Sequence, residues 1–240
     1  MDFRERASPN HDARPEGGHI DMLVLHYTGM KTAAEAIDRL CDPAAKVSAH
    51  YVIEEDGTTW RLIEESRRAW HAGVSSWQST RHVNAVSIGI ELINPGHEWG
   101  YRAFPEAQMA SLETLCGELL QRHPIPADRV VGHSDVAPLR KQDPGELFDW
   151  PRLAHAGVGL WPTEPAPLPT SISAAQTMLD AIGYGVPSTR VLDEETRQVL
   201  IAFQRRFRPS RIDGDLDQDT AARLAAVERA VSTLRACRPS

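Results

Sequence analysis

The sequence predicts an α/β domain, in which a mixed central β-sheet is flanked by helices, followed by a small all-α domain of three helices. Three observations support this fold class. Short apolar runs alternate with helical periodicity up to about residue 150. A proline-rich segment, WPTEPAPLPT at residues 161–170, is incompatible with a continuing helix or a central strand. Three amphipathic helical patterns come after it. We therefore expect one domain at residues 1–160, an extended linker at 161–170 and a second domain at 171–240.

In the first domain, the apolar runs predict strands that alternate with helices. The strands are expected at residues 22–26, 49–54, 59–63, 86–93 and 130–131, and the helices at residues 32–41 and 105–122. Pro105 suits the start of its helix, where a backbone N–H would have no partner within the helix. This order of elements is typical of a mixed sheet that helices cover.

In the second domain, hydrophobic residues recur at helical spacing in three stretches. The apolar positions are Ile172, Ala175, Leu179 and Ile182, then Val199, Leu200, Phe203 and Phe207, and finally Leu224, Val227, Val231 and Leu234. Gly183 follows the first stretch as a typical helix stop. Asp193 and Asp217 precede the other two helices and indicate acidic caps, which accept hydrogen bonds from free backbone amides.

Composition excludes several classes of protein. The chain is 41% hydrophobic and 25% charged, which is typical of a globular protein. No apolar run approaches the roughly 20 residues that a membrane-spanning helix requires. Residues 1–170 contain 16 Lys and Arg against 24 Asp and Glu, and residues 171–240 contain 10 against 9. Because neither part is dominated by positive charge, we expect neither nucleic acid nor a membrane as a partner.

Two observations predict a cytoplasmic location. The first twenty residues lack an apolar stretch that could form the core of a secretion signal. Cys41, Cys116 and Cys237 are odd in number and widely separated, unlike a disulfide framework or a thiolate zinc site. A reducing compartment is consistent with this pattern. The sequence leaves the oligomeric state open.

Two histidines and an aspartate are candidate ligands for one zinc ion. His26 closes the apolar strand MLVLH, His133 follows the strand in RVVGH, and Asp143 lies ten residues later in the turn RKQDPG. Two neutral imidazoles and a carboxylate would leave a fourth zinc position open, as in catalytic sites. The alternative is that these histidines are ordinary surface or core residues, since their spacing matches no compact metal motif.

Glu91 and Lys141 are the candidate catalytic side chains. In the strand SIGIEL, a period of two places Glu91 on one face with Gly89, opposite the isoleucines. A carboxylate in so apolar a strand needs a partner or a task. It is either paired with a cation such as Arg81 or a general base beside the zinc ion, with Gly89 leaving room for a substrate. Lys141, two residues before Asp143, either stabilises an oxyanion or is a solvated surface lysine.

Around these residues the chain resembles the type 2 N-acetylmuramoyl-L-alanine amidases. These zinc enzymes cut the amide bond between the lactyl group of N-acetylmuramic acid and the first alanine of the stem peptide. The matching pieces occur in the family's order and are LVLHYTG at 23–29, SAHYVIEEDG at 48–57, AWHAGVSSW at 69–77, NAVSIGIELIN at 84–94, VVGHSDVAP at 130–138 and KQDPG at 141–145. Residues 171–240 resemble the three-helix peptidoglycan-binding module of cell-wall hydrolases.

The resemblance implies a role for each site residue. His26, His133 and Asp143 would bind zinc, Glu91 would be the catalytic carboxylate, and Lys141 would assist at the oxyanion. The residues that the resemblance implies for substrate binding are Tyr51, His71, Ala72, Arg81 and Asn84. Tyr51 is equally compatible with a core position. We expect a structural role for His50.

These features together predict a zinc amidase that acts on muropeptides or other peptidoglycan fragments. Because a cytoplasmic enzyme does not meet intact cell wall, we expect the substrate to be the 1,6-anhydro form released during peptidoglycan recycling. Two alternatives stay open. One is an envelope or phage-type amidase that acts on polymeric wall, and the other is a protein that binds peptidoglycan fragments without catalysis.

Overall fold

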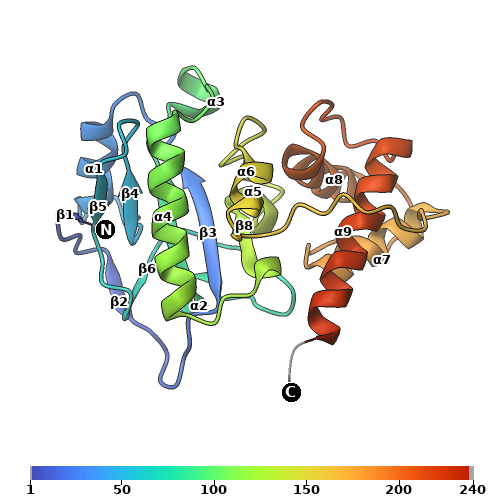
Figure 1. Cartoon of the computed structure of the whole chain (residues 1–240), viewed down its shortest axis with the longest axis horizontal. Helices are drawn as coiled ribbons and strands as arrows, with labels where there is room; N and C mark the ends of the chain where they lie inside the picture. Colours follow the sequence, from blue (N-terminus) through green and yellow to red (C-terminus); the bar gives the residue numbers. More distant parts are fainter. Residues whose placement is uncertain (1, 238–240) are drawn as a thin grey trace.

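The computed structural model describes residues 2–237 and contains the predicted mixed sheet with helices on both sides (Figure 1). The strands are β1 (Arg4–Glu5), β2 (His11–Ala13), β3 (Met22–Tyr27), β4 (Tyr51–Ile53), β5 (Thr59–Arg61), β6 (Arg67–Ala69), β7 (Ser87–Leu92) and β8 (Val130–Gly132). The helices are α1 (Ala33–Cys41), α2 (Val83–Val86), α3 (Gly96–Trp99), α4 (Glu106–Arg122), α5 (His133–Val136), α6 (Trp150–His155), α7 (Ile172–Ile182), α8 (Glu194–Phe207) and α9 (Gln218–Ala236), with a 3-10 turn, η1, at Ala127–Arg129. No helix among the described residues has the length and apolar character needed to cross a membrane.

The main sheet has the order β1-β5-β4-β7-β3-β8, and β2 pairs with β6 in a separate ribbon. Strands β4, β7, β3 and β8 run parallel, so their carboxyl ends meet at one edge of the sheet. The one antiparallel main-sheet pair in the described chain, β4 with β5, makes the sheet mixed, as the sequence predicts. In open sheets of this kind, ligand sites lie outside the carboxyl ends of parallel strands.

The predicted elements are present with shifted ends. Pro105 is the N-cap of α4, which begins at Glu106, and Val86 belongs to the short helix α2 instead of the strand that follows. The periodicity did not predict β1, β2, β6, α2, α3, η1, α5 or α6. These elements span two to six residues, which is too short for a hydrophobic period to show.

Side chains alternate along the central strands and divide the core between the two faces of the sheet. Leu23 and Leu25 of β3 pack with helix α4 on one face. Met22 and Val24 point to the other face, where their apolar cluster includes residues of α7, α8 and α9. On that same face, Val52 packs with α1. The C-terminal helices therefore pack against the second face on the side of β3 and β8 (Figure 1).

The segment 161–170 contains neither helix nor strand, in agreement with its prolines. The division into domains at residues 160 and 170 stays a prediction. The shared apolar cluster implies that the C-terminal helices stabilise the sheet as well as their own core.

A buried ion pair connects the C-terminal helices to α5. Asp135 is fully buried and Arg206 of α8 is 4% exposed, with 2.7 Å between guanidinium and carboxylate. The Tyr184 hydroxyl donates to the same carboxylate at 2.6 Å, and the backbone N–H of Gly132 donates at 2.8 Å. The guanidinium also donates to the Val130 carbonyl at 3.0 Å. Asp135 thus has a partner for each oxygen, which offsets its desolvation.

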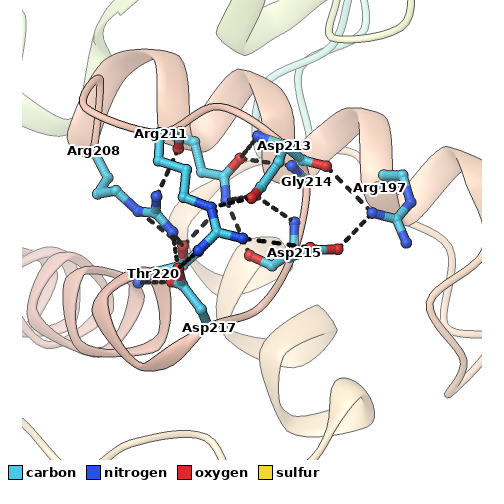
Figure 2. A network of polar contacts seen from close by, with 9 residues as sticks. Arg197, Arg208, Arg211, Asp213, Gly214, Asp215, Asp217 and Thr220 are labelled. Carbon is cyan, nitrogen blue, oxygen red and sulfur yellow. Dashed lines mark hydrogen bonds and ion pairs between the residues drawn. The ribbon is translucent and has the colours of Figure 1, made fainter.

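The loop between α8 and α9 is organised by the buried side chain of Gln204. Its amide nitrogen donates to the carbonyl of Asp215 at 2.9 Å, and its oxygen accepts from the backbone N–H of Gly214 at 2.8 Å. Figure 2 shows that the acidic side chains of this loop face arginines; Arg197 contacts Asp215 at 2.7 Å, and Arg208 contacts Asp217. The acid-rich loop is therefore an ion-pair network that fixes the turn.

Replacing Arg206 by Met is expected to lower the free energy of unfolding by about 3–5 kcal/mol, because Asp135 would stay buried without its cation. Urea unfolding followed by circular dichroism measures the change. The exposed Arg229 on α9 provides a matched control, since its replacement by Met is expected to change stability by less than about 0.5 kcal/mol. Equal midpoints for the two variants would contradict this role of the pair.

Candidate active site

Three side chains from separate segments meet at the carboxyl edge of the sheet. The Nδ1 atoms of His26 and His133 lie 2.9 Å apart, and each lies 3.0 Å from Oδ2 of Asp143. All three residues are buried. The structure thus brings together the three residues that the sequence singles out as candidate zinc ligands.

The fold explains why residues so distant in sequence converge. His26 is near the end of β3, and His133 begins α5 directly after the neighbouring strand β8. The chain then turns back on itself, because the backbone N–H of Ser134 donates to the carbonyl of Asp143 at 2.9 Å. The parallel pairing of the two strands and this return of the loop produce the cluster.

The protonation states of this cluster suit a cation. Burial lowers the pKa of His26 to about 4 and keeps its imidazole neutral. Burial alone would raise the pKa of Asp143, but the two adjacent imidazoles hold it well below its usual range. Nε2 of His133 donates to the carbonyl of Ala72 at 3.1 Å, so Nδ1 is the ring nitrogen that faces His26 and Asp143.

These donors fit a zinc ion. Two imidazole nitrogens and one carboxylate oxygen are a ligand set of catalytic zinc sites, which keep a fourth position open. Tetrahedral zinc bonds of about 2.0–2.1 Å imply ligand separations of about 3.3 Å. The observed separations of 2.9–3.0 Å need to widen by only a few tenths of an ångström.

Glu91 lies beside this cluster, directly opposite His26 in the parallel register of β3 and β7. Its Oε2 atom is buried and has no hydrogen-bond partner among residues 2–237. Burial raises the pKa of Glu91 to about 8; the negative charge of Asp143 adds to the shift and Lys141 opposes it. Arg81 is exposed and lines another groove, so the structure excludes the ion pair with Arg81 that the sequence left open.

A pocket of about 390 Å³ opens over these residues. Glu91, Lys141 and all three residues of the cluster line it, so Lys141 is not an isolated surface lysine. The structure adds Arg39, Trp70 and Arg140, which the sequence analysis did not propose. Arg39 lies on the exposed side of α1, and its sequence context does not distinguish it from other surface arginines.

The residues proposed to bind substrate are distributed over different parts of the structure. His71 lines the pocket. Ala72 is fully buried, and its backbone N–H donates to Asn84 Oδ1 at 2.8 Å. The Asn84 side-chain oxygen also accepts from the N–H of His71 at 3.3 Å. Asn84 therefore holds the backbone of residues 71–72 in place.

Three expectations need correction. Tyr51 points to the α4 face of the sheet, because successive residues of a strand face opposite sides. Its hydroxyl donates to Glu65 at 2.6 Å. It does not line the pocket, and neither does Arg81. Gly89 does not leave room for a substrate, since a Cβ atom there would lie 2.4 Å from Cγ of His71. The space above Gly89 is filled by the His71 ring.

His50 has the structural position that we expected. It is fully buried, its Nδ1 accepts from the backbone N–H of Gly89 at 3.0 Å, and its Nε2 contacts the carbonyl of Arg67 at 3.1 Å. It thereby links β7 to the segment that carries β6.

Comparison with known proteins identifies the family. The N-acetylmuramoyl-L-alanine amidase profile matches residues 16–146, and a peptidoglycan binding domain profile matches residues 169–224. The amidase AmiD of Escherichia coli is 35% identical over 225 residues, which cover 85% of this chain and 80% of that protein. The 1,6-anhydro-N-acetylmuramyl-L-alanine amidase AmpD of Haemophilus influenzae is 36% identical over 169 residues, covering 63% of this chain and 90% of that protein.

A solved structure agrees over nearly the whole chain. Escherichia coli AmiD in complex with the substrate anhydro-N-acetylmuramic acid-L-Ala-D-gamma-Glu-L-Lys superposes with a TM-score of 0.77 at 33% identity, covering 95% of this chain and 94% of that one. The predicted fold class and family resemblance are both confirmed. The chain belongs to the N-acetylmuramoyl-L-alanine amidase family and combines its catalytic domain with a C-terminal domain of the peptidoglycan-binding type.

Proposed function

We propose that this enzyme hydrolyses the amide bond between 1,6-anhydro-N-acetylmuramic acid and L-alanine in soluble muropeptides, as a step in peptidoglycan recycling. The observation that carries the proposal is the convergence of His26, His133 and Asp143 beside Glu91, whose buried Oε2 has no hydrogen-bond partner in the described part of the chain. The named substrates of AmiD and AmpD support the anhydro form. The cytoplasm stays the predicted compartment.

His26, His133 and Asp143 would hold one zinc ion. When bound, zinc polarises a carbonyl oxygen and lowers the pKa of a water molecule toward about 7. The three ligand residues line the pocket, so the ion would face it. Their burial would keep bulk water away from the ion.

Glu91 acts as the general base and then as the general acid. It takes a proton from the attacking water as the lactyl carbonyl becomes tetrahedral, and it returns that proton to the alanine nitrogen as the C–N bond breaks. Burial raises the pKa of Glu91 above its usual range, which favours a group that must hold the proton from water until the C–N bond breaks.

Lys141 supplies positive charge at the rim of the same pocket. The carbonyl oxygen gains negative charge in the tetrahedral state, and a fixed cation nearby lowers the energy of that state. None of Cys41, Cys116 or Cys237 lines the pocket, in agreement with a direct attack by water without a covalent enzyme intermediate.

Mass spectrometry of a defined anhydro-muropeptide is expected to show free stem peptide and free anhydro-N-acetylmuramic acid as the products. Preincubation with a chelator is expected to abolish the cleavage, and added zinc is expected to restore it. A suspension of purified cell wall serves as the competing substrate. Activity confined to the polymeric wall would refute the recycling role, and binding without cleavage would indicate a recognition protein.

Replacing Glu91 by Gln is expected to leave zinc content unchanged and to lower kcat by a factor on the order of 10² or more, because the amide accepts no proton. Zinc analysis and steady-state kinetics on the same preparation measure both quantities. Turnover close to that of the unmodified enzyme would remove Glu91 from the role of base.

Replacing His26 by Ala is expected to abolish zinc binding and hydrolysis together, because one of three ligands is lost. His155, which is exposed at the end of α6, gives a control variant that should keep both properties. An unchanged zinc content in the His26→Ala variant would show that the ion binds elsewhere.

A further inference from the structure

The ring of His71 is held between strand β7 and the imidazole of His26. It is 8% exposed, and it lies so close to Gly89 that the glycine has no space for a Cβ atom. Its two nitrogens contact different partners, with Nδ1 3.0 Å from Nε2 of His26 and Nε2 3.1 Å from Oγ of Ser87. This position raises the question of where the ring protons lie.

The direction of these hydrogen bonds follows from the Val83 carbonyl, which ends the hydrogen-bonded series that begins at His26. Oγ of Ser87 lies 2.7 Å from the carbonyl oxygen of Val83, which only accepts. The single hydroxyl proton of Ser87 is therefore directed to that carbonyl. Consequently Ser87 accepts at its other contact, and His71 carries its proton on Nε2.

This proton position determines the tautomer of His26. A neutral imidazole with its proton on Nε2 has a lone pair on Nδ1. Nδ1 of His71 then accepts from Nε2 of His26, and the proton of His26 is on Nε2. The Nδ1 lone pair of His26 is left facing His133 and Asp143, where a metal ligand is needed.

We propose that His71 is a positioning residue, which passes the hydrogen-bond direction set by Val83 and Ser87 to His26 and so fixes the tautomer and orientation of this ligand. The inference rests on the proposed zinc site. It assigns His71 a role different from the substrate contact that the family resemblance implies.

His133, the second ligand histidine, is oriented in a similar way, but through a single hydrogen bond to the backbone. Nε2 of His133 donates directly to the carbonyl of Ala72, the residue after His71. Since Asn84 accepts from the backbone N–H groups of both residues 71 and 72, one short segment orients both ligand imidazoles. Partners of this kind typically change metal affinity by about 10–100-fold when they are removed.

Two near-isosteric variants separate the two hydrogen bonds of His71. In His71→Asn, the amide oxygen can take the place of Nδ1 and still accept from His26. In His71→Gln, the amide nitrogen can take the place of Nε2 and still donate to Ser87, but the acceptor for His26 is lost. We expect His71→Gln to raise the zinc dissociation constant by about 10–100-fold and His71→Asn to stay within a few-fold of the unmodified protein.

Competition with a fluorescent chelator measures zinc affinity in these variants and in the control His155→Gln. Long-range ¹H–¹⁵N correlation spectra of the metal-free protein report the tautomer directly. We expect a protonated Nε2 and an unprotonated Nδ1 for His26 in the unmodified protein, and a mixture of tautomers in His71→Gln. If both His71 variants fail to fold, Ser87→Ala provides the test, and the same mixture of tautomers is expected there.

Each other outcome has a definite meaning. Unchanged zinc affinity in His71→Gln, or a raised KM at unchanged zinc affinity, would overturn the inference and indicate a substrate contact. A His26 proton on Nδ1 in the unmodified protein would also overturn it. Failure of the unmodified enzyme to bind zinc or cleave muropeptide would instead refute the proposed function, while the spectra would still report the tautomer.

Discussion

The parallel pairing of β3 with β7 is the constraint on which the rest of the site depends. Its register places His26 opposite Glu91 and Val24 opposite Gly89, with the four side-chain positions on one face of the sheet. A register shift of one residue would turn Glu91 into the α4 core. The apolar residues on the other face, which pack against α4, therefore fix the positions of His26 and Glu91 through ordinary hydrophobic burial.

Buried polar groups at the site are stable because nearly every one of them has a partner. His26 is hydrogen-bonded to His71, and His71 is hydrogen-bonded to Ser87. His133 is hydrogen-bonded to the carbonyl of Ala72. The described residue that departs from this rule within the pocket is Glu91, whose Oε2 lacks a partner. An unsatisfied buried carboxylate is costly, and its position facing the pocket is what an enzyme that transfers protons requires.

The C-terminal helices contribute to the fold of the catalytic region. They complete the second face of the sheet over Met22 and Val24, and Arg206 holds Asp135 two residues after the candidate ligand His133. Peptidoglycan binding by this domain is compatible with such a position but is not needed to explain its sequence. Its capping aspartates, Asp193 and Asp217, accept from backbone amides of Thr196 and Thr220, as their spacing predicts.

The sequence by itself determined the local features of this protein. It predicted that Glu91 and Gly89 share a strand face, that His26 closes one strand and that His133 follows another, because the period of two and the strand limits are local properties of the backbone. Only the tertiary structure decided which groups meet. Tyr51 faces α4, Arg81 lines another groove, and His71 fills the space above Gly89, since the neighbour of each face is set by contacts between segments far apart in the chain.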